Sequence, residues 1–295
     1  MIAFLRGCLA MLALAANTVL WCTPLLTLSL VKLLLPLAAV RRHLDPLLNR
    51  IAKNWIACNN ALWAAVNPGM TWDVQGAESL QPGGWYLVNA NHQSWVDIFV
   101  LQKVLNRRIP LLKFFLKREL IFVPVIGLAW WALDFPFMRR HGKAALRRNP
   151  ALRQQDQQAT RRACERFALV PTSVTNFAEG TRFTPAKHQA QGSPYRHLLK
   201  PKAGAMALAL GALGEKFRAL VDVTIVYPDG APRFWDLLCG RVRRVVVRVR
   251  VLEVPAGFAA GDFTADGEYR RAFHRWLDEL WREKDAQIDG LLHGT

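Results

Sequence analysis

The apolar residues of this chain are concentrated at its beginning. No charged side chain occurs from Gly7 to Val31, and after Lys32 the apolar run resumes as far as Val40. A helix built from the 25 residues of the uncharged stretch would be about 38 Å long, which is enough to cross a hydrocarbon core of ~30 Å. The pattern therefore predicts a hydrophobic, helical membrane anchor over residues 1–40.

Two features of this stretch leave its form open. Pro24 and Pro36 are compatible with one tilted span or with two short helices that enter one leaflet and return. Small residues at 13–17 also resemble a signal-peptide cleavage site, although the apolar run continues well beyond the core of an ordinary signal peptide. Cations are sparse before the run and frequent after it, so the positive-inside rule predicts that the rest of the chain stays in the cytoplasm. These cations are Arg6 before the run and Arg41, Arg42, Arg50 and Lys53 after it.

The pattern changes after the anchor. Residues 47–66 carry apolar side chains at helical spacing, with cations and asparagines between them, which predicts an amphipathic helix at the membrane surface. Turn residues then surround a short strand at 70–76. We therefore divide the chain into an anchor (1–40), an interfacial helix with a linker (41–69) and a domain (70–295).

Within the domain, strand and helix patterns roughly alternate. Short apolar or alternating runs predict strands, and apolar residues at helical spacing predict helices. The strands are expected at 70–76, 85–90, 171–178, 220–228 and 241–254, and the helices at 94–105, 143–168, 203–213 and 267–288. This order predicts an α/β fold with a mixed sheet flanked by helices.

A second apolar stretch lies at 120–138. Only 14 uncharged residues separate Glu119 from Asp134, which is too few to span a bilayer. We interpret this stretch as the wall of a pocket or as a floor that faces the membrane.

The composition narrows the possible partners. The formal net charge is +17 and 52% of the residues are hydrophobic, a balance that attracts polyanions such as nucleic acid, an anionic membrane or a phosphorylated small molecule. No zinc finger, RNA-recognition signature or basic zipper occurs, which argues against a nucleic-acid partner. The five cysteines are scattered, without C-x-x-C pairs or zinc spacing, so neither a metal site nor a disulfide framework is expected.

The stretch NHQSWVD places His92 five residues before Asp97, in the loop between a predicted strand and a predicted helix. A carboxylate on the first turn of that helix could accept a hydrogen bond from one imidazole nitrogen and leave the other free to take a proton. Ser94 and Asp97 also fit a helix-capping box. These residues alone leave both interpretations open.

A second polar group follows the strand at 171–178. Glu179, Gly180, Thr181 and Arg182 combine a carboxylate, a residue suited to a tight turn, a hydroxyl and a guanidinium. Arginine can bind a phosphate with two parallel hydrogen bonds, so a phosphate site is one interpretation. A turn with solvated charges is the other.

Together these features favour one kind of chemistry. A general base, a phosphate site and an apolar surface near a membrane suit acyl transfer to a hydroxyl on a phosphorylated lipid. The chain has no G-x-S-x-G elbow and no G-x-x-x-x-G-K-[ST] loop, which argues against a serine lipase and a P-loop nucleotidase.

Six short motifs occur in one order between residues 91 and 228. They are NHQSWVD, KRELIFVPVIG, FMRR, FAEGTRF, LLKPKAGA and VTIVYP. In this respect the chain resembles the 1-acylglycerol-3-phosphate acyltransferase family, the PlsC-like lysophospholipid acyltransferases. The family motif F-P-E-G-T-R has proline where this chain has Ala178. In this departure the chain is similar to the branch of long-chain and lysocardiolipin-type acyltransferases.

The resemblance implies a role for each matched residue. His92 would deprotonate the acceptor hydroxyl and Asp97 would orient His92, so that the acceptor attacks an acyl thioester directly. The acceptor phosphate site would be formed by Glu179, Gly180, Thr181 and Arg182 with the assistance of Arg139, and Lys117 would be a further substrate-binding residue. No cofactor or metal is implied, and the acyl donor would be acyl-CoA or acyl-carrier protein.

The expected protein is thus a membrane enzyme on the cytoplasmic face of the inner membrane. Its expected partners are the membrane phospholipids and a lysophospholipid acceptor, to which it would transfer an acyl group. The alternative is a non-catalytic protein that binds anionic lipid, for which the basic run at 241–250 could contact membrane phosphates. The acceptor head group, the acyl chain length and the oligomeric state are left open.

Overall fold

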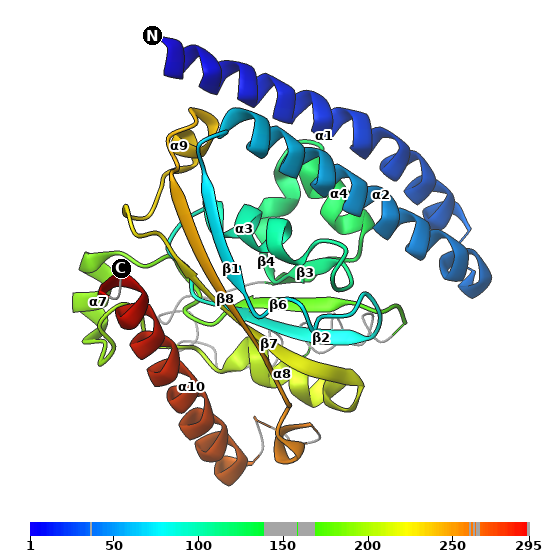
Figure 1. The fold of residues 1–295 in the computed structure, drawn as a ribbon. Helices are drawn as coiled ribbons and strands as arrows, with labels where there is room; N and C mark the ends of the chain where they lie inside the picture. Colours follow the sequence, from blue (N-terminus) through cyan, green and yellow to red (C-terminus); the bar gives the residue numbers. More distant parts are fainter. Residues whose placement is uncertain are drawn as a thin grey trace.

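A computed structural model describes residues 1–35, 37–138, 158, 169–259, 261, 263 and 266–293 (Figure 1). Its centre is a six-stranded sheet in the order β1-β8-β7-β2-β6-β3. The strands are β1 (Thr71–Gln75), β2 (Trp85–Ala90), β3 (Leu112–Phe114), β6 (Ser173–Phe177), β7 (Phe217–Val226) and β8 (Arg244–Leu252). Apart from residue 158, the helix predicted at 143–168 lies outside the described residues, as does the predicted site residue Arg139.

Parallel and antiparallel pairs occur in the same sheet. Strands β3, β6, β2 and β7 run parallel to one another, β8 is antiparallel to β7, and β1 is parallel to β8. A separate pair joins β4 (Leu116–Lys117) to β5 (Phe137–Met138). The predicted mixed α/β fold is therefore confirmed.

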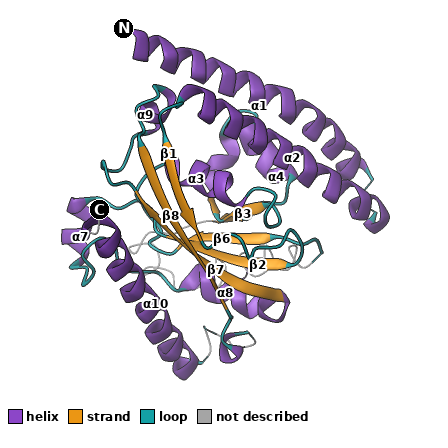
Figure 2. Ribbon diagram, in the orientation of Figure 1, coloured by secondary structure: helices purple, strands orange, loops and turns teal. Residues whose placement is uncertain are grey.

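Helices cover both faces of the sheet (Figure 2). The alternation of side chains along β2 sends Val88 to a core with α3 (Val96–Leu105) and Leu87 to a core on the other face. On that other face lie α8 (Gly204–Leu213) and α10 (Gly267–His293).

The helix α10 is amphipathic, as its sequence predicts. Phe273, Leu277, Trp281 and Ile288 recur at helical spacing and are fully buried against the sheet. The indole N–H of Trp281 donates to the carbonyl of Leu199 at 3.0 Å, so α10 also supports the loop that precedes α8.

At the N-terminus, α1 (Ile2–Leu34) and α2 (Ala38–Val66) pack against each other as a helical hairpin (Figure 1). The helix α1 continues through Pro24 rather than breaking there. Among the described residues it is the one helix long and apolar enough to cross a membrane. Its packed side carries mainly small and polar residues, while many large apolar side chains on it, such as Phe4, Leu12 and Leu20, are exposed.

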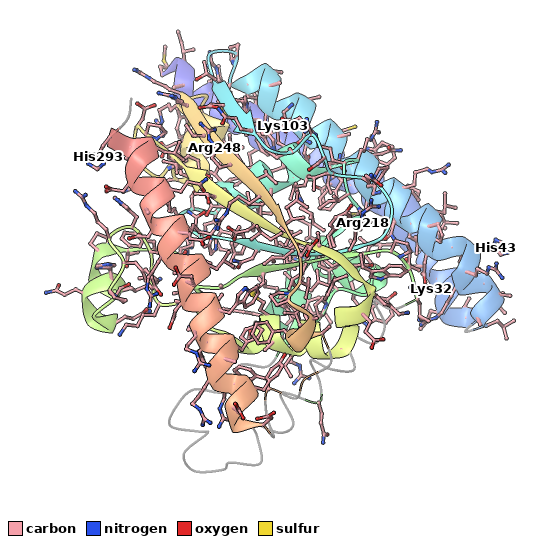
Figure 3. The ribbon with its side chains drawn as sticks, turned by 60° about the horizontal axis from the view of Figure 1, so that its bottom comes forward. Lys32, His43, Lys103, Arg218, Arg248 and His293 are labelled. Carbon is pink, nitrogen blue, oxygen red and sulfur yellow. The ribbon has the colours of Figure 1, made fainter. Side chains whose placement is uncertain are left out.

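A buried cation fixes the far end of α1. The ammonium of Lys32 lies 2.8 Å from a carboxylate oxygen of Asp45 in α2 and 2.6 Å from one of Asp134, which follows α4 (Ile126–Ala132). Lys32, the residue that interrupts the apolar run, therefore forms ion pairs with two carboxylates of the same chain. Figure 3 shows Lys32 and His43 together near the turn of the hairpin.

The apolar stretch 120–138 forms a short turn, α4 and the strand β5. It packs on α1 through Ala129 and Ala132, but Phe122, Leu128 and Trp131 are exposed. This exposure is consistent with a surface that faces the membrane, which stays a prediction.

Candidate active site

The predicted catalytic residues lie where neighbouring parallel strands end. In the register of the sheet, Ala90 at the end of β2 faces Phe177 at the end of β6 and Val223 near the end of β7. The segments that follow these strands therefore leave the sheet at the same edge, where α/β proteins commonly bind ligands. This topology brings His92 and Glu179 together.

His92 and Asp97 are in direct contact. The Nδ1 atom of His92 lies 2.8 Å from Oδ2 of Asp97, whose side chain is completely buried. A carboxylate accepts hydrogen bonds, so Nδ1 carries the proton and Nε2 is left to accept one. This is the arrangement that a histidine base requires.

Asp97 also caps its own helix. Its Oδ2 atom accepts from the backbone N–H groups of Gln93 at 2.6 Å and Ser94 at 2.8 Å. The Ser94 hydroxyl accepts from the N–H of Val96 at 3.0 Å. The capping interpretation and the contact with His92 are therefore compatible, since one carboxylate makes both sets of contacts.

The imidazole is held by its neighbours. Its ring stacks on Phe177, with the centroids 4.0 Å apart and the planes 15° from parallel. Phe114 of β3 stacks in turn on Phe177. The ring plane of His92 is thus fixed by stacking and by the bond to Asp97, while 13% of the side chain stays exposed.

Glu179 is fully buried beneath the same loop. One carboxylate oxygen accepts from the backbone N–H of His92 at 2.7 Å and the other from the N–H of Leu199 at 2.9 Å. Burial raises the pKa of Glu179 to about 7, although both backbone donors favour the charged form. Glu179 thereby ties the His92 loop to the loop before α8, and its contact with an acceptor stays a prediction.

The turn that follows Glu179 presents cations. Gly180 has φ +67°, a conformation that glycine adopts without strain. The guanidinium of Arg182 lies 4.9 Å from the ring centroid of Trp95. The ammonium of Lys187 donates to the hydroxyl of Thr181 at 2.8 Å and to the carbonyl of Arg182 at 3.0 Å. Within the described residues, no carboxylate forms an ion pair with Arg182 or Lys187.

Sequence reasoning missed Lys187. It lies five residues after Arg182, just beyond the motif FAEGTRF, where Pro185 begins the short helix α7 (Pro185–Gln191). That helix brings Lys187 back to Thr181. A cation so close in sequence to a predicted phosphate site could have indicated that Lys187 belongs to the site.

Lys117 is placed apart from this group. It is exposed at the end of β4, and within the described part of the chain no hydrogen bond or ion pair joins it to His92 or to residues 179–182. Its role, like that of Arg139, stays a prediction.

Tyr227 is a second residue that the sequence did not single out. It directly follows β7, is 4% exposed, and its hydroxyl donates to Oδ1 of Asp97 at 2.6 Å. The signal was positional, since a residue at the end of a strand beside β2 lies close to the segment that carries His92.

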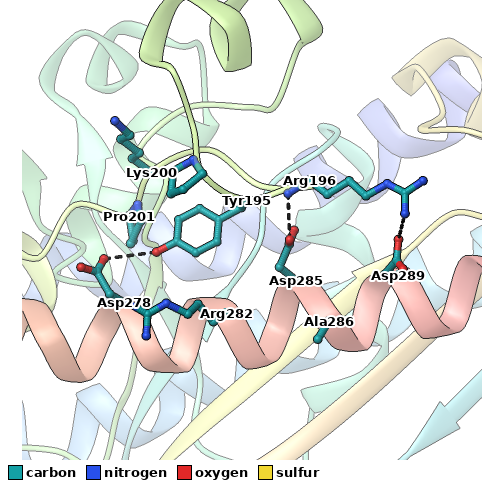
Figure 4. A pocket seen from close by; sticks show the side chains of 10 residues that line it. Tyr195, Arg196, Lys200, Pro201, Asp278, Arg282, Asp285, Ala286 and Asp289 are labelled. Atoms are coloured by element: carbon teal, nitrogen blue, oxygen red, sulfur yellow. Dashed lines mark hydrogen bonds and ion pairs between the residues drawn. The ribbon is translucent and has the colours of Figure 1, made fainter.

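A cavity lies away from these residues (Figure 4). It has a volume of about 600 Å³ between residues 194–201 and α10, and none of its lining residues is a predicted site residue. Its carboxylates already have partners: Asp278 accepts from Tyr195, and Asp285 accepts from the N–H of Arg196. The cavity therefore reflects the packing of this loop on α10.

Comparisons with known proteins identify the family of this chain. A family model described as Acyltransferase matches residues 71–228. The chain is 27% identical over 181 residues to mouse 1-acyl-sn-glycerol-3-phosphate acyltransferase gamma (58% of this chain, 43% of the relative). It is 27% identical over 214 residues to the human delta form (68% and 51%), so the chain spans about half the length of these curated relatives.

A solved structure has a similar fold. The crystal structure of the 1-acyl-sn-glycerophosphate (LPA) acyltransferase PlsC from Thermotoga maritima aligns with a TM-score of 0.56 and 15% sequence identity. The alignment covers 97% of this chain and 98% of that one. At this identity the likeness concerns the fold.

Proposed function

This chain belongs to the acyltransferase family, and on that basis we propose that it transfers a fatty acyl group from an acyl thioester to the free hydroxyl of a lysophospholipid. The observation that carries the proposal is the contact of His92 with Asp97, 2.8 Å apart, beside the 179–182 turn with its cation Arg182. The named relatives act on 1-acyl-sn-glycerol 3-phosphate, so this acceptor and its sn-2 hydroxyl are the first candidates.

In the proposed mechanism, His92 acts as the general base. Its Nε2 takes the proton of the acceptor hydroxyl while the oxygen attacks the thioester carbonyl. The new oxygen–carbon bond forms, the carbon–sulfur bond breaks, and the imidazolium returns the proton to the leaving thiolate. Asp97 stabilises the imidazolium through the bond to Nδ1, so no acyl-enzyme is needed.

The acceptor phosphate is proposed to bind at the turn of residues 179–182. Arg182 supplies a guanidinium, and the hydroxyl of Thr181 already accepts from Lys187, which leaves its own proton available to a phosphate oxygen. Lys117 and Arg139 are the candidates for further phosphate contacts. The donor is proposed to be acyl-CoA or acyl-carrier protein, without a cofactor.

We also propose a location at the membrane. The exposed apolar side chains of α1 and of the stretch 120–138 would enter the bilayer, and the cations that follow α1 would keep the domain on the cytoplasmic face. The inner membrane is the expected one.

The test is acyl transfer by the detergent-solubilised protein. We would offer radiolabelled oleoyl-CoA, and separately an acyl-carrier-protein donor, with a panel of lysophospholipids. We expect product on at least one acceptor, loss of that product in His92→Ala, and retention in His293→Ala, where an exposed histidine of α10 is removed.

The outcomes are distinct. Full turnover in His92→Ala would remove this residue as the base. No product from either donor on any acceptor would contradict the proposed activity and favour the alternative of a non-catalytic protein that binds anionic lipid.

A further inference from the structure

Tyr227 is buried against the carboxylate of Asp97 and reaches it from a different strand than His92. On the premise of the proposed function, we propose that Tyr227 is a positioning residue that holds Asp97 in the orientation that His92 needs and sets the basicity of His92. Nothing in the motif comparison assigns a role to this side chain.

The hydrogen bonds divide the carboxylate into two halves. Oδ2 accepts from His92 and from the N–H groups of Gln93 and Ser94, whereas Oδ1 accepts from the hydroxyl of Tyr227 at 2.6 Å. With both oxygens bonded on opposite sides, the carboxylate cannot turn about its Cβ–Cγ bond without losing several contacts. Tyr227 therefore keeps Oδ2 directed at His92.

The position of Tyr227 is itself fixed relative to the His92 loop. The side-chain amide of Asn91 donates to the carbonyl of Ile225 and accepts from its N–H, both at 2.8 Å. This clamp joins the residue before His92 to the strand end that carries Tyr227. His92 and Tyr227, which bond to the two oxygens of the Asp97 carboxylate, are thus held in fixed positions relative to each other.

The hydroxyl acts as a donor throughout. Burial, and then the neighbouring Asp97, raises the pKa of Tyr227 well above its ordinary value, so the phenol keeps its proton. A donor on Oδ1 draws charge from the carboxylate and weakens its attraction for an imidazolium. Among the described residues, Glu179 also lies close to the pair, and the ammonium of Lys284 in α10, which is paired with Asp222, acts on Glu179 in turn.

Tyr227→Phe tests this role because it removes one oxygen and keeps the ring. We expect kcat to fall roughly 10- to 100-fold, because the buried, charged Oδ1 loses its donor and Asp97 is then oriented by the contacts of Oδ2 alone. The acceptor KM should change little. The acid limb of the pH profile of kcat/KM should move up by about half to one pH unit, since the imidazolium is then better stabilised.

Tyr195→Phe is the matched control. Tyr195 is also buried and also donates from its hydroxyl to a carboxylate, that of Asp278, at 3.2 Å, beside the cavity on α10. We expect wild-type kcat and an unshifted pH profile in this variant. Equal losses of kcat in both variants would mean that a buried tyrosine–carboxylate hydrogen bond affects only the stability of the protein. That result would overturn the proposal.

A second readout does not depend on acyl transfer. Diethylpyrocarbonate modifies neutral imidazole, so the pH midpoint of His92 modification, followed by mass spectrometry of its peptide, reports its basicity. We expect a higher midpoint in Tyr227→Phe than in the wild type and Tyr195→Phe. A Tyr227→Phe variant with the wild-type modification midpoint and the wild-type kcat would refute the role of Tyr227. A wild-type protein that transfers no acyl group would refute the proposed function instead. In that case the modification midpoint alone would still test the role of Tyr227.

Discussion

Glu179 should make the stability of this protein depend on pH where an ordinary glutamate would not. Burial raises its pKa from 4.5 to about 7, so between these values the folded chain holds a proton that the unfolded chain has released. The stabilisation from this group is therefore complete below about pH 4.5 and is lost as the pH rises through 7.

The magnitude follows from the width of that window. It spans about 2.5 pH units, the difference between 4.5 and 7, and each unit corresponds to about 1.4 kcal/mol, which gives a total of about 3.5 kcal/mol. At roughly 2 °C per kcal/mol for a chain of this length, the melting temperature should fall by ~7 °C across the window because of Glu179 alone.

The assay compares the melting temperatures of the wild type and Glu179→Gln in detergent at several pH values. Glutamine cannot titrate. Its NH2 group, a donor, would face one of the two backbone N–H donors and leave that N–H without an acceptor, so the variant should be less stable at every pH. The difference between the two proteins should shrink as the pH rises. Glu279→Gln, which changes an exposed side chain of α10, should show no such trend. Parallel curves for the wild type and Glu179→Gln would refute the reasoning.

Two further predictions concern the acceptor phosphate. Arg182→Ala should raise the acceptor KM about 10- to 100-fold with a smaller effect on kcat, because a charge-assisted hydrogen bond is lost; an unchanged acceptor dependence of the rate would remove Arg182 from the site. Lys187→Met keeps the apolar stem but frees the Thr181 hydroxyl, so we expect a smaller rise of about threefold to tenfold in the same KM. Lys200→Met, on the rim of the separate cavity, should match the wild type, and an equal rise there would point to general electrostatics.

Much of the local structure could be predicted from the sequence. The strand predicted at 85–90 is β2 without change, because its compact apolar run lies in the middle of the sheet. The helix predicted at 94–105 begins two residues later, at Val96. The reason is that Asp97 accepts from the N–H groups of Gln93 and Ser94, which keeps these residues in the loop.

Contacts between distant segments could not be predicted in this way. The bond between Tyr227 and Asp97 joins residues 130 positions apart, and that between Glu179 and His92 joins residues 87 apart. Both depend on the order and register of β2, β6 and β7, which periodicity does not encode. The sequence places Glu179 in a phosphate site by resemblance, whereas its described partners are backbone N–H groups.

The docking of α1 has a consequence for how the domain would meet a bilayer. A domain on a flexible tether can swing through a wide range of heights above its anchor. Here Lys32 is paired with Asp45 and Asp134, so α1 is fastened to α2 and to the segment after α4. If the apolar side of α1 lies in the membrane as proposed, the height of His92 above the lipid is set by the fold itself, and a lysophospholipid reaches it by lateral diffusion.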